Sequence, residues 1–134
     1  MKMSAKDKFF EVAKCFGLHI VEPDKNSKFI FDRNYYYAYI GNIKSFEDLS
    51  DRDEQCILRY SNLDRTLWIP KRLMTSHSRL YFHSFYPVNG KSATIENIKE
   101  EVSQLIILFK KQLNELNKYK IEMDFVWTWL IMNL

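Results

Sequence analysis

The chain is poor in the residues that break or cross-link a fold. Its 134 residues include 3 glycines, 3 prolines and 2 cysteines. The glycines, Gly17, Gly41 and Gly90, are too scattered to form a phosphate-cradling loop. So little Gly and Pro, together with 46% apolar and 16% aromatic residues, excludes a disordered tail. Because this length is close to that of a common domain, we expect a single domain over residues 1–134.

Long apolar runs and disulfide patterns are also scarce. Cys15 and Cys56 cannot build a disulfide framework, and no secretory signal pattern opens the sequence, so we expect a cytoplasmic protein with two reduced thiols. A single disulfide between them is the alternative. The longest uncharged apolar run is Phe125 to Leu134, about half of a membrane-spanning helix, so we expect no membrane insertion. Such a run is typically buried in the domain core or in a subunit interface.

Signatures of metal and nucleophilic chemistry are missing. His19, His77 and His83 have neither HxxxH spacing nor a CxxC partner, so we predict no metal site, and nothing indicates a cofactor. Ser76, His77 and Ser78 are neighbours in sequence, whereas catalytic triads are assembled in space, and we interpret them as a polar loop. We therefore expect a protein that is not an enzyme. An enzyme would require His77 or His83 to meet a carboxylate across the fold.

Residue spacing in the first 40 positions predicts a helix followed by a meander. Ser4 and Asp7 form a capping box, and Gly17 is a stop signal for the helix between them. Residues 28–33 and 35–40 are rich in aromatic and branched side chains, which favours two antiparallel strands. In the second of these strands, side chains alternate between the two faces. Tyr35, Tyr37 and Tyr39 are expected on one face, and Tyr36, Ala38 and Ile40 on the other.

The middle of the chain leaves one element open. Ser50 and Asp53 favour a helix over residues 51–60, while a strand over residues 56–61 is the competing interpretation. Residues 66–69 and 80–86 then predict a strand pair joined by a cationic loop over residues 71–79. Pro70 cannot donate to a ladder, so the first of these strands ends there or lies on an edge.

The last 40 residues predict one long helix. From Thr94 onward the apolar positions follow helical spacing with no Gly or Pro: 95, 98, 102, 105, 106, 109, 113 and 116, extended through 119, 123, 126 and 130. At 1.5 Å per residue such a helix would span about 58 Å, far beyond the radius of gyration of about 14 Å expected for this domain. Either it breaks around residues 117–120 and folds back, or it projects and pairs with another chain. We predict an α+β fold, a small mostly antiparallel sheet packed against an N-terminal and a long C-terminal helix.

Charge is segregated along the chain. Residues 65–95 contain no Asp or Glu and carry +5, although the whole protein is only +3. An acidic block of five carboxylates over residues 47–54 lies just upstream, where it suits the first turn of a helix. The basic stretch is also rich in aromatic residues. Clustered cations with exposed rings are typical of a surface that meets phosphates and unpaired bases.

The sequence therefore supports a non-enzymatic binding protein that engages an anionic macromolecule, with nucleic acid or an acidic protein surface as the partner. The binding residues we predict supply charge or stacking: Arg65, Trp68, Lys71, Arg72, Arg79, Tyr81 and Lys91. An ordinary amphipathic hairpin with a solvated cationic side is the structural alternative.

The rival functional hypothesis is a protein interaction module, an accessory or inhibitory subunit that docks through its C-terminal helix and apolar tail. Its predicted interface is Phe125, Trp127, Trp129 and Leu130. A homodimer through the same helix is one form of it.

Overall fold

The protein is an α+β domain, as the sequence predicts. The computed structural model describes residues 3–40, 55–76, 79–89 and 93–133, without the side chains of Ser76 and Arg79. In chain order the elements are α1 (Ala5–Cys15), β1 (His19–Val21), α2 (Ile30–Asn34), β2 (Tyr35–Tyr39), β3 (Cys56–Ser61), β4 (Thr66–Ser76), β5 (Arg79–Pro87) and α3 (Ile95–Met132).

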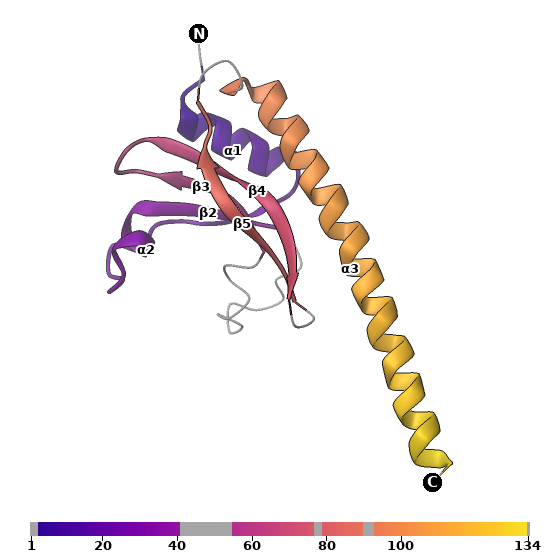
Figure 1. The fold of residues 1–134 in the computed structure, drawn as a ribbon. Coiled ribbons are helices and arrows are strands. Elements are labelled where there is room, and N and C mark those ends of the chain that lie inside the picture. Colours follow the sequence, from indigo (N-terminus) through magenta and orange to yellow (C-terminus); the bar gives the residue numbers. More distant parts are fainter. Residues whose placement is uncertain (1–2, 41–54, 77–78, 90–92, 134) are drawn as a thin grey trace.

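The five strands form one antiparallel meander in the order β1-β2-β3-β4-β5. α1 packs against β3 and β4, and α3 packs against β4 and β5 as well as against α1. Both long helices therefore cover the same face of the sheet, as Figure 1 shows. We call this the helix face and the opposite one the outer face.

α1 begins and ends at the predicted residues. The Ser4 side chain accepts a hydrogen bond from the Asp7 N–H at 3.1 Å, which confirms the N-terminal cap. Gly17 has φ +63°, a left-handed conformation that favours glycine, and it follows the last turn. Phe9, Val12 and Ala13 are fully buried against the sheet.

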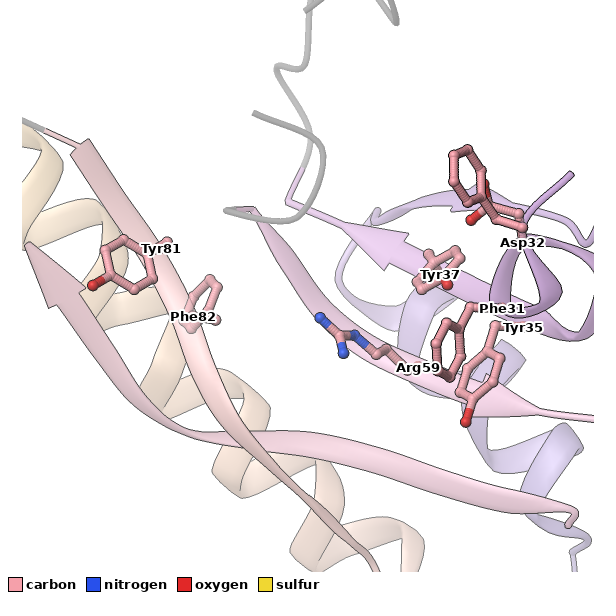
Figure 2. Close-up of a pocket in the computed structure, with 8 residues that line it drawn as sticks. Phe31, Asp32, Tyr35, Tyr37, Arg59, Tyr81 and Phe82 are labelled. Carbon is pink, nitrogen blue, oxygen red and sulfur yellow. The ribbon is translucent and has the colours of Figure 1, made fainter. Parts of the chain in front are cut away.

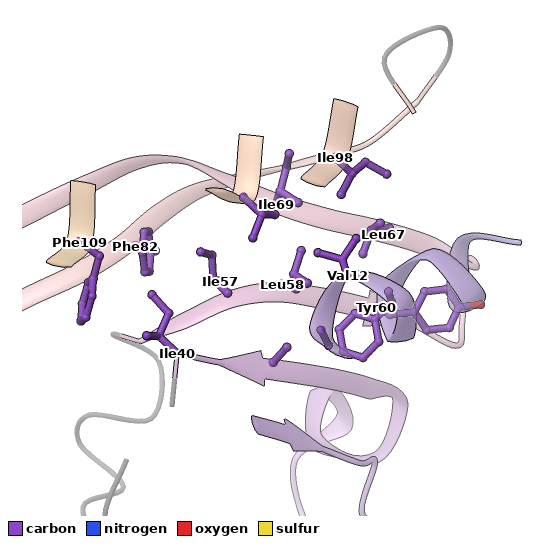
Figure 3. Close-up of a cluster of buried hydrophobic side chains, with 14 of the residues drawn as sticks. Val12, Ile40, Ile57, Leu58, Tyr60, Leu67, Ile69, Phe82, Ile98 and Phe109 are labelled. Carbon is purple, nitrogen blue, oxygen red and sulfur yellow. The ribbon is translucent and has the colours of Figure 1, made fainter. Parts of the chain in front are cut away.

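The main core lies between the helix face and the two long helices (Figure 3). Ala38 of β2 faces this core together with Leu58 and Tyr60 of β3. The even-numbered residues of β2 therefore lie on the helix face, as strand alternation predicts. The other tyrosine row of β2 lies on the outer face, where Tyr37 and Tyr39 form a second buried cluster with Cys56. No disulfide joins the exposed Cys15 to the buried Cys56, whose thiol donates to the Leu58 carbonyl at 3.3 Å.

One predicted strand is wrong. Residues 28–33 do not pair in the sheet, because Ile30–Asn34 forms the short helix α2. Polar contacts from the preceding turn hold this segment. The Ser27 side chain accepts from the Phe29 N–H at 3.2 Å, and the Asp24 N–H donates to the Asp32 carbonyl at 2.7 Å. Phe29 and Phe31 are 70% and 62% exposed, so their apolar character does not mark a core strand.

The open element is resolved in favour of a strand. Residues 56–61 form β3, and the predicted helix over residues 51–60 is therefore wrong from residue 56 onward; residues 51–54 and the acidic block lie outside the described residues. Five of the six β3 side chains are buried, on both faces of the sheet. A helix in this place would bury only one stripe.

The predicted loop over residues 71–79 is also wrong, because β4 continues to Ser76 and pairs with β5 as one long hairpin. Pro70 lies inside β4, where it pairs with Phe85. The described pairing of β4 with β3 ends at Trp68, so the missing N–H of Pro70 falls on an edge of the ladder, as the sequence predicts.

α3 is continuous from its cap at Thr94 to Met132 and does not fold back. Its first half packs on the sheet, and its second half projects beyond it (Figure 1). The prediction that residues 125–134 could be buried in the core of their own domain is wrong, because every described side chain from Asn117 to Asn133 is exposed. Among the described residues, no helix has the length and apolar character needed to cross a membrane.

The packing of α3 gives a first prediction. Ile98 is 1% exposed and Ile107 is 58% exposed on the same helix. Ile98→Ala should lower the free energy of unfolding by about 2–5 kcal/mol because it leaves a cavity, whereas Ile107→Ala should change it by less than about 0.5 kcal/mol. Urea unfolding followed by circular dichroism at one protein concentration measures both. Equal losses in the two variants would contradict this packing.

Candidate functional site

The outer face carries a row of side chains that crosses four strands. Tyr37 on β2 is opposite Arg59 on β3, Arg59 is opposite Trp68 on β4, and Trp68 is opposite Pro87 on β5. Residues directly opposite each other in a ladder point to the same side of the sheet. By the same register Arg72 shares this face with His83, and Met74 shares it with Tyr81.

Arg59 is at the centre of this face. Its guanidinium carbon lies over the Phe85 ring, 3.8 Å from the ring centroid, which is a cation–π contact. It lines two adjoining cavities of about 460 and 450 Å³ that also share Tyr35 and Phe82. Figure 2 shows the Arg59 side chain extending between the rings of Tyr81 and Phe82 on one side and those of Phe31 and Tyr35 on the other.

Three nitrogens on this face have no hydrogen-bond partner in the part of the chain that the structure describes. They are Nε of Arg59, Nε1 of Trp68 and Nε2 of His83, and all three atoms are buried. All three residues line the second of the two cavities. A buried polar group without a partner costs about 1–3 kcal/mol. Nε of Arg59 and Nε1 of Trp68 are donors that lack acceptors, and the Arg59 guanidinium is cationic, so this part of the face favours a ligand that brings acceptors and negative charge. Nδ1 of His83 lies 2.8 Å from the Ser84 hydroxyl oxygen, and the tautomer decides whether its Nε2 donates or accepts.

The rim of the larger cavity adds exposed rings. Phe29 and Phe31, both highly exposed, project from the segment around α2, and Tyr35 stacks on Tyr37 with ring centroids 6.0 Å apart. Asp32 is the acidic residue among those that line this cavity. Among the described residues, the face therefore combines arginine, exposed rings and little negative charge, which are the ingredients of a stacking surface for anionic aromatic groups.

The predicted binding residues do not all reach this face. Trp68, Arg72 and Tyr81 do. Lys71 is adjacent to Arg72 in β4 but points to the helix face, where its Nζ lies 5.5 Å from the centroid of Tyr86. Arg65 is exposed in the turn between β3 and β4, with φ +56°. The Arg79 side chain and Lys91 lie outside the described residues, as do His77 and Ser78.

Lys71 belongs instead to a groove between β4, β5 and α3. The groove has a volume of about 490 Å³, and Glu100 and Glu101 of α3 line it together with Tyr86. The Tyr86 hydroxyl donates to Oε2 of Glu101 at 2.6 Å. Burial, reinforced by this hydrogen bond and by the negative charge of Glu101, raises the pKa of Tyr86 to about 12. The groove is therefore partly acidic and is a poor site for phosphate.

The predicted partner interface at the end of α3 is exposed. Phe125, Trp127, Trp129 and Leu130 have exposed fractions of 71, 62, 56 and 44%. They project from the domain on a single helix and lie away from the outer face of the sheet (Figure 1).

Sequence reasoning missed Arg59, Tyr35 and the rings of Phe29 and Phe31. The segment that holds Arg59 is open between a helix and a strand in the sequence, and in a helix Arg59 would have no fixed relation to Trp68. The available signal was the strand interpretation of residues 56–61, in which Arg59 points to the face opposite to its neighbours Leu58 and Tyr60.

Comparisons with known proteins add no assignment: no family model, no curated protein and no solved structure matches the chain. Within the described residues, no three His, Cys, Asp or Glu side chains gather as metal ligands would.

The raised pKa of Tyr86 gives a second prediction. The folded protein keeps the phenolic proton to a higher pH than the unfolded chain, whose tyrosines titrate near 10. The resulting stabilisation is complete below pH 10 and is lost as the pH rises through about 12. Tyr86→Phe lacks this proton, so its unfolding free energy should fall less across that window than that of the unsubstituted protein. Urea unfolding below pH 10 and near pH 12 measures the difference between the two proteins. Parallel losses in both would contradict the assignment.

Proposed function

We propose that this chain is a non-enzymatic binding protein that engages single-stranded nucleic acid through the outer face of its sheet. The observation that carries the proposal is Arg59, whose guanidinium lies over the Phe85 ring among aromatic residues and beside the buried indole nitrogen of Trp68, which has no acceptor among the described residues. Arginine presents a planar fork of donors that suits phosphate oxygens. Aromatic rings stack on unpaired bases whatever their sequence.

Arg72 extends this charge along β4. It is exposed, and it is opposite His83 on the same face as Trp68 and Tyr81. A strand of nucleic acid that followed the hairpin would therefore meet Arg59 and Arg72 with its phosphates while its bases contacted the rings around them. Duplex DNA is a poorer partner for this face, because its bases are stacked on each other and are not free to stack on protein rings.

The two neighbouring cations of β4 provide the third prediction. Arg72 and Lys71 are adjacent and both exposed, but they point to opposite faces, so they form a matched pair. Arg72→Gln should weaken binding of a labelled mixed-sequence oligonucleotide and lower the slope of log K against log salt by about 0.7, the value for one phosphate contact on a single strand. Lys71→Gln should leave both quantities close to those of the unsubstituted protein. Fluorescence anisotropy over a salt series measures them.

Arg59→Gln tests the centre of the face in the same assay and should weaken binding at least as much as Arg72→Gln. Circular dichroism of each variant establishes that the fold is kept. Equal effects of Lys71→Gln and Arg72→Gln would show that the hairpin acts only as a diffuse source of charge, and binding that ignores salt would remove nucleic acid as the partner.

A further inference from the structure

The end of α3 exposes more apolar surface than a soluble monomer usually shows. Ten large apolar side chains between residues 119 and 132 have exposed fractions of 38 to 79%: Tyr119, Ile121, Met123, Phe125, Val126, Trp127, Trp129, Leu130, Ile131 and Met132. A contiguous patch of this kind marks an interaction surface.

The apolar stripe that packs on the sheet continues into this end with the same spacing. Val102, Phe109, Leu116, Met123 and Leu130 recur every seven residues, and the position three residues further on holds Leu105, Gln112, Tyr119 and Val126, so it is apolar in all but one repeat. The sheet covers the stripe only as far as Leu116, the last α3 residue that packs against the main core. Beyond it the same seam is exposed. A seven-residue repeat of this kind is the pattern by which two helices pack together.

We propose that the exposed seam of α3 pairs with the same segment of a second copy of this chain in antiparallel orientation. The pairing does not depend on the proposed binding face, which lies on the other side of the sheet.

The fold itself determines the orientation. The domain sits on the same face of α3 as the seam, directly N-terminal to the exposed segment. In a parallel pair the first half of the partner helix would have to pass through the space that the sheet occupies. In an antiparallel pair the two domains lie at opposite ends, and the tip of each helix reaches the edge of the other domain.

The register follows from this arrangement. If the partner's Asn133 lies beside Leu116 at the edge of the domain, then the partner's Leu130 is opposite Tyr119, and the partner's Val126 is opposite Met123. Each contact layer then joins a residue of the seven-residue series on one helix to a residue of the second series, three positions further on, of the partner helix, as antiparallel helix pairs require. The pairing covers the exposed segment along its whole length.

The residues that flank the seam are complementary in this register. Lys120 would lie beside the partner's Trp127, where an ammonium over an indole face is favourable. Glu122 would lie beside the partner's Trp129, whose indole N–H can donate to a carboxylate. Lys120 and Glu122, in the first half of each exposed segment, thus lie beside tryptophans in the second half of the partner's segment. Each helix therefore supplies both the charged and the aromatic side of these contacts.

The area involved is sufficient for a stable dimer. Six side chains per copy would be covered, with present exposed fractions of 38 to 62%: Tyr119, Met123, Val126, Trp127, Trp129 and Leu130. At about 100 Å² each, roughly half of what a fully buried aromatic residue contributes, two copies would bury on the order of 1,200 Å². This lies within the range of specific interfaces.

The mass of the protein in solution tests the pairing, which is the fourth prediction. Sedimentation equilibrium without nucleic acid should give twice the 16.2 kDa of one chain, and the mass should not change with added salt. Leu130→Glu, in the seam, should give a monomer. Ile121→Glu, which is 69% exposed on the side of the helix away from the seam, should remain a dimer. Both positions are exposed, so the domain should fold in either variant, and circular dichroism checks this.

Cysteine cross-linking tests the orientation in a Cys15→Ser background. Tyr119→Cys mixed with Leu130→Cys should form a disulfide between the two variants, whereas each variant alone should not, because identical positions would lie about 17 Å apart along the helix. Efficient cross-linking of either variant alone would demonstrate a parallel pair and overturn the proposal. A monomer, a mass above that of a dimer, or an exposed end that binds lipid vesicles while the protein stays monomeric would overturn it as well.

Discussion

The packing of one apolar stripe of α3 on the helix face of the sheet is the constraint on which the rest of the structure depends. The stripe brings Ile98, Val102 and Phe109 into a core that α1 shares, and so it fixes which face of the meander is covered. The stripe also continues beyond the part of α3 that the sheet covers. A helix of 38 residues is about 57 Å long, and a five-stranded sheet can cover only part of it. Local helix propensity cannot explain why the second half of α3 has an apolar stripe, because polar residues are favoured on a helix surface that faces solvent. The proposed pairing of that half with a second copy would explain it.

The coverage of one face by two helices leaves the outer face to side chains of another kind. A small sheet with one solvated face normally alternates apolar and polar residues. Here the outer face carries rings and arginines, and some of its nitrogens are buried without acceptors in the described part of the chain. Stability alone does not favour this choice, because each such nitrogen costs free energy that a hydrocarbon in its place would not. A ligand with acceptor atoms would offset that cost, so the composition of the face is easier to understand in a binding protein than in a purely structural one.

The sequence predicts the elements whose signals are local. Ser4, Gly17 and Thr94 act through hydrogen bonds or backbone conformation within one turn, and the limits of α1 and the start of α3 follow from them. β3 was ambiguous because a strand buried on both faces loses its alternation. α2 was missed because it depends on contacts from Asp24 and Ser27 that no periodicity reveals. The same limits apply to the binding face. Trp68, Arg72 and Tyr81 could be grouped by type, but only the continuous β4–β5 register separates Arg72 from Lys71 and brings Arg59 beside Trp68.

The two proposed surfaces rest on different physics and would reinforce each other. Contacts with phosphate weaken as salt rises because counterions are released on binding, whereas burial of the α3 seam is apolar and hardly depends on salt. Antiparallel pairing would hold two domains at opposite ends of a helical rod, with the two copies of Leu116 about 26 Å apart along it. A nucleic acid long enough to reach both outer faces would then bind the second domain at a high effective concentration, so two weak faces could give useful affinity together. A face with only a few cations binds weakly at physiological salt. If the proposed pairing holds, the length of α3 beyond the sheet would supply the second face that a single small domain lacks.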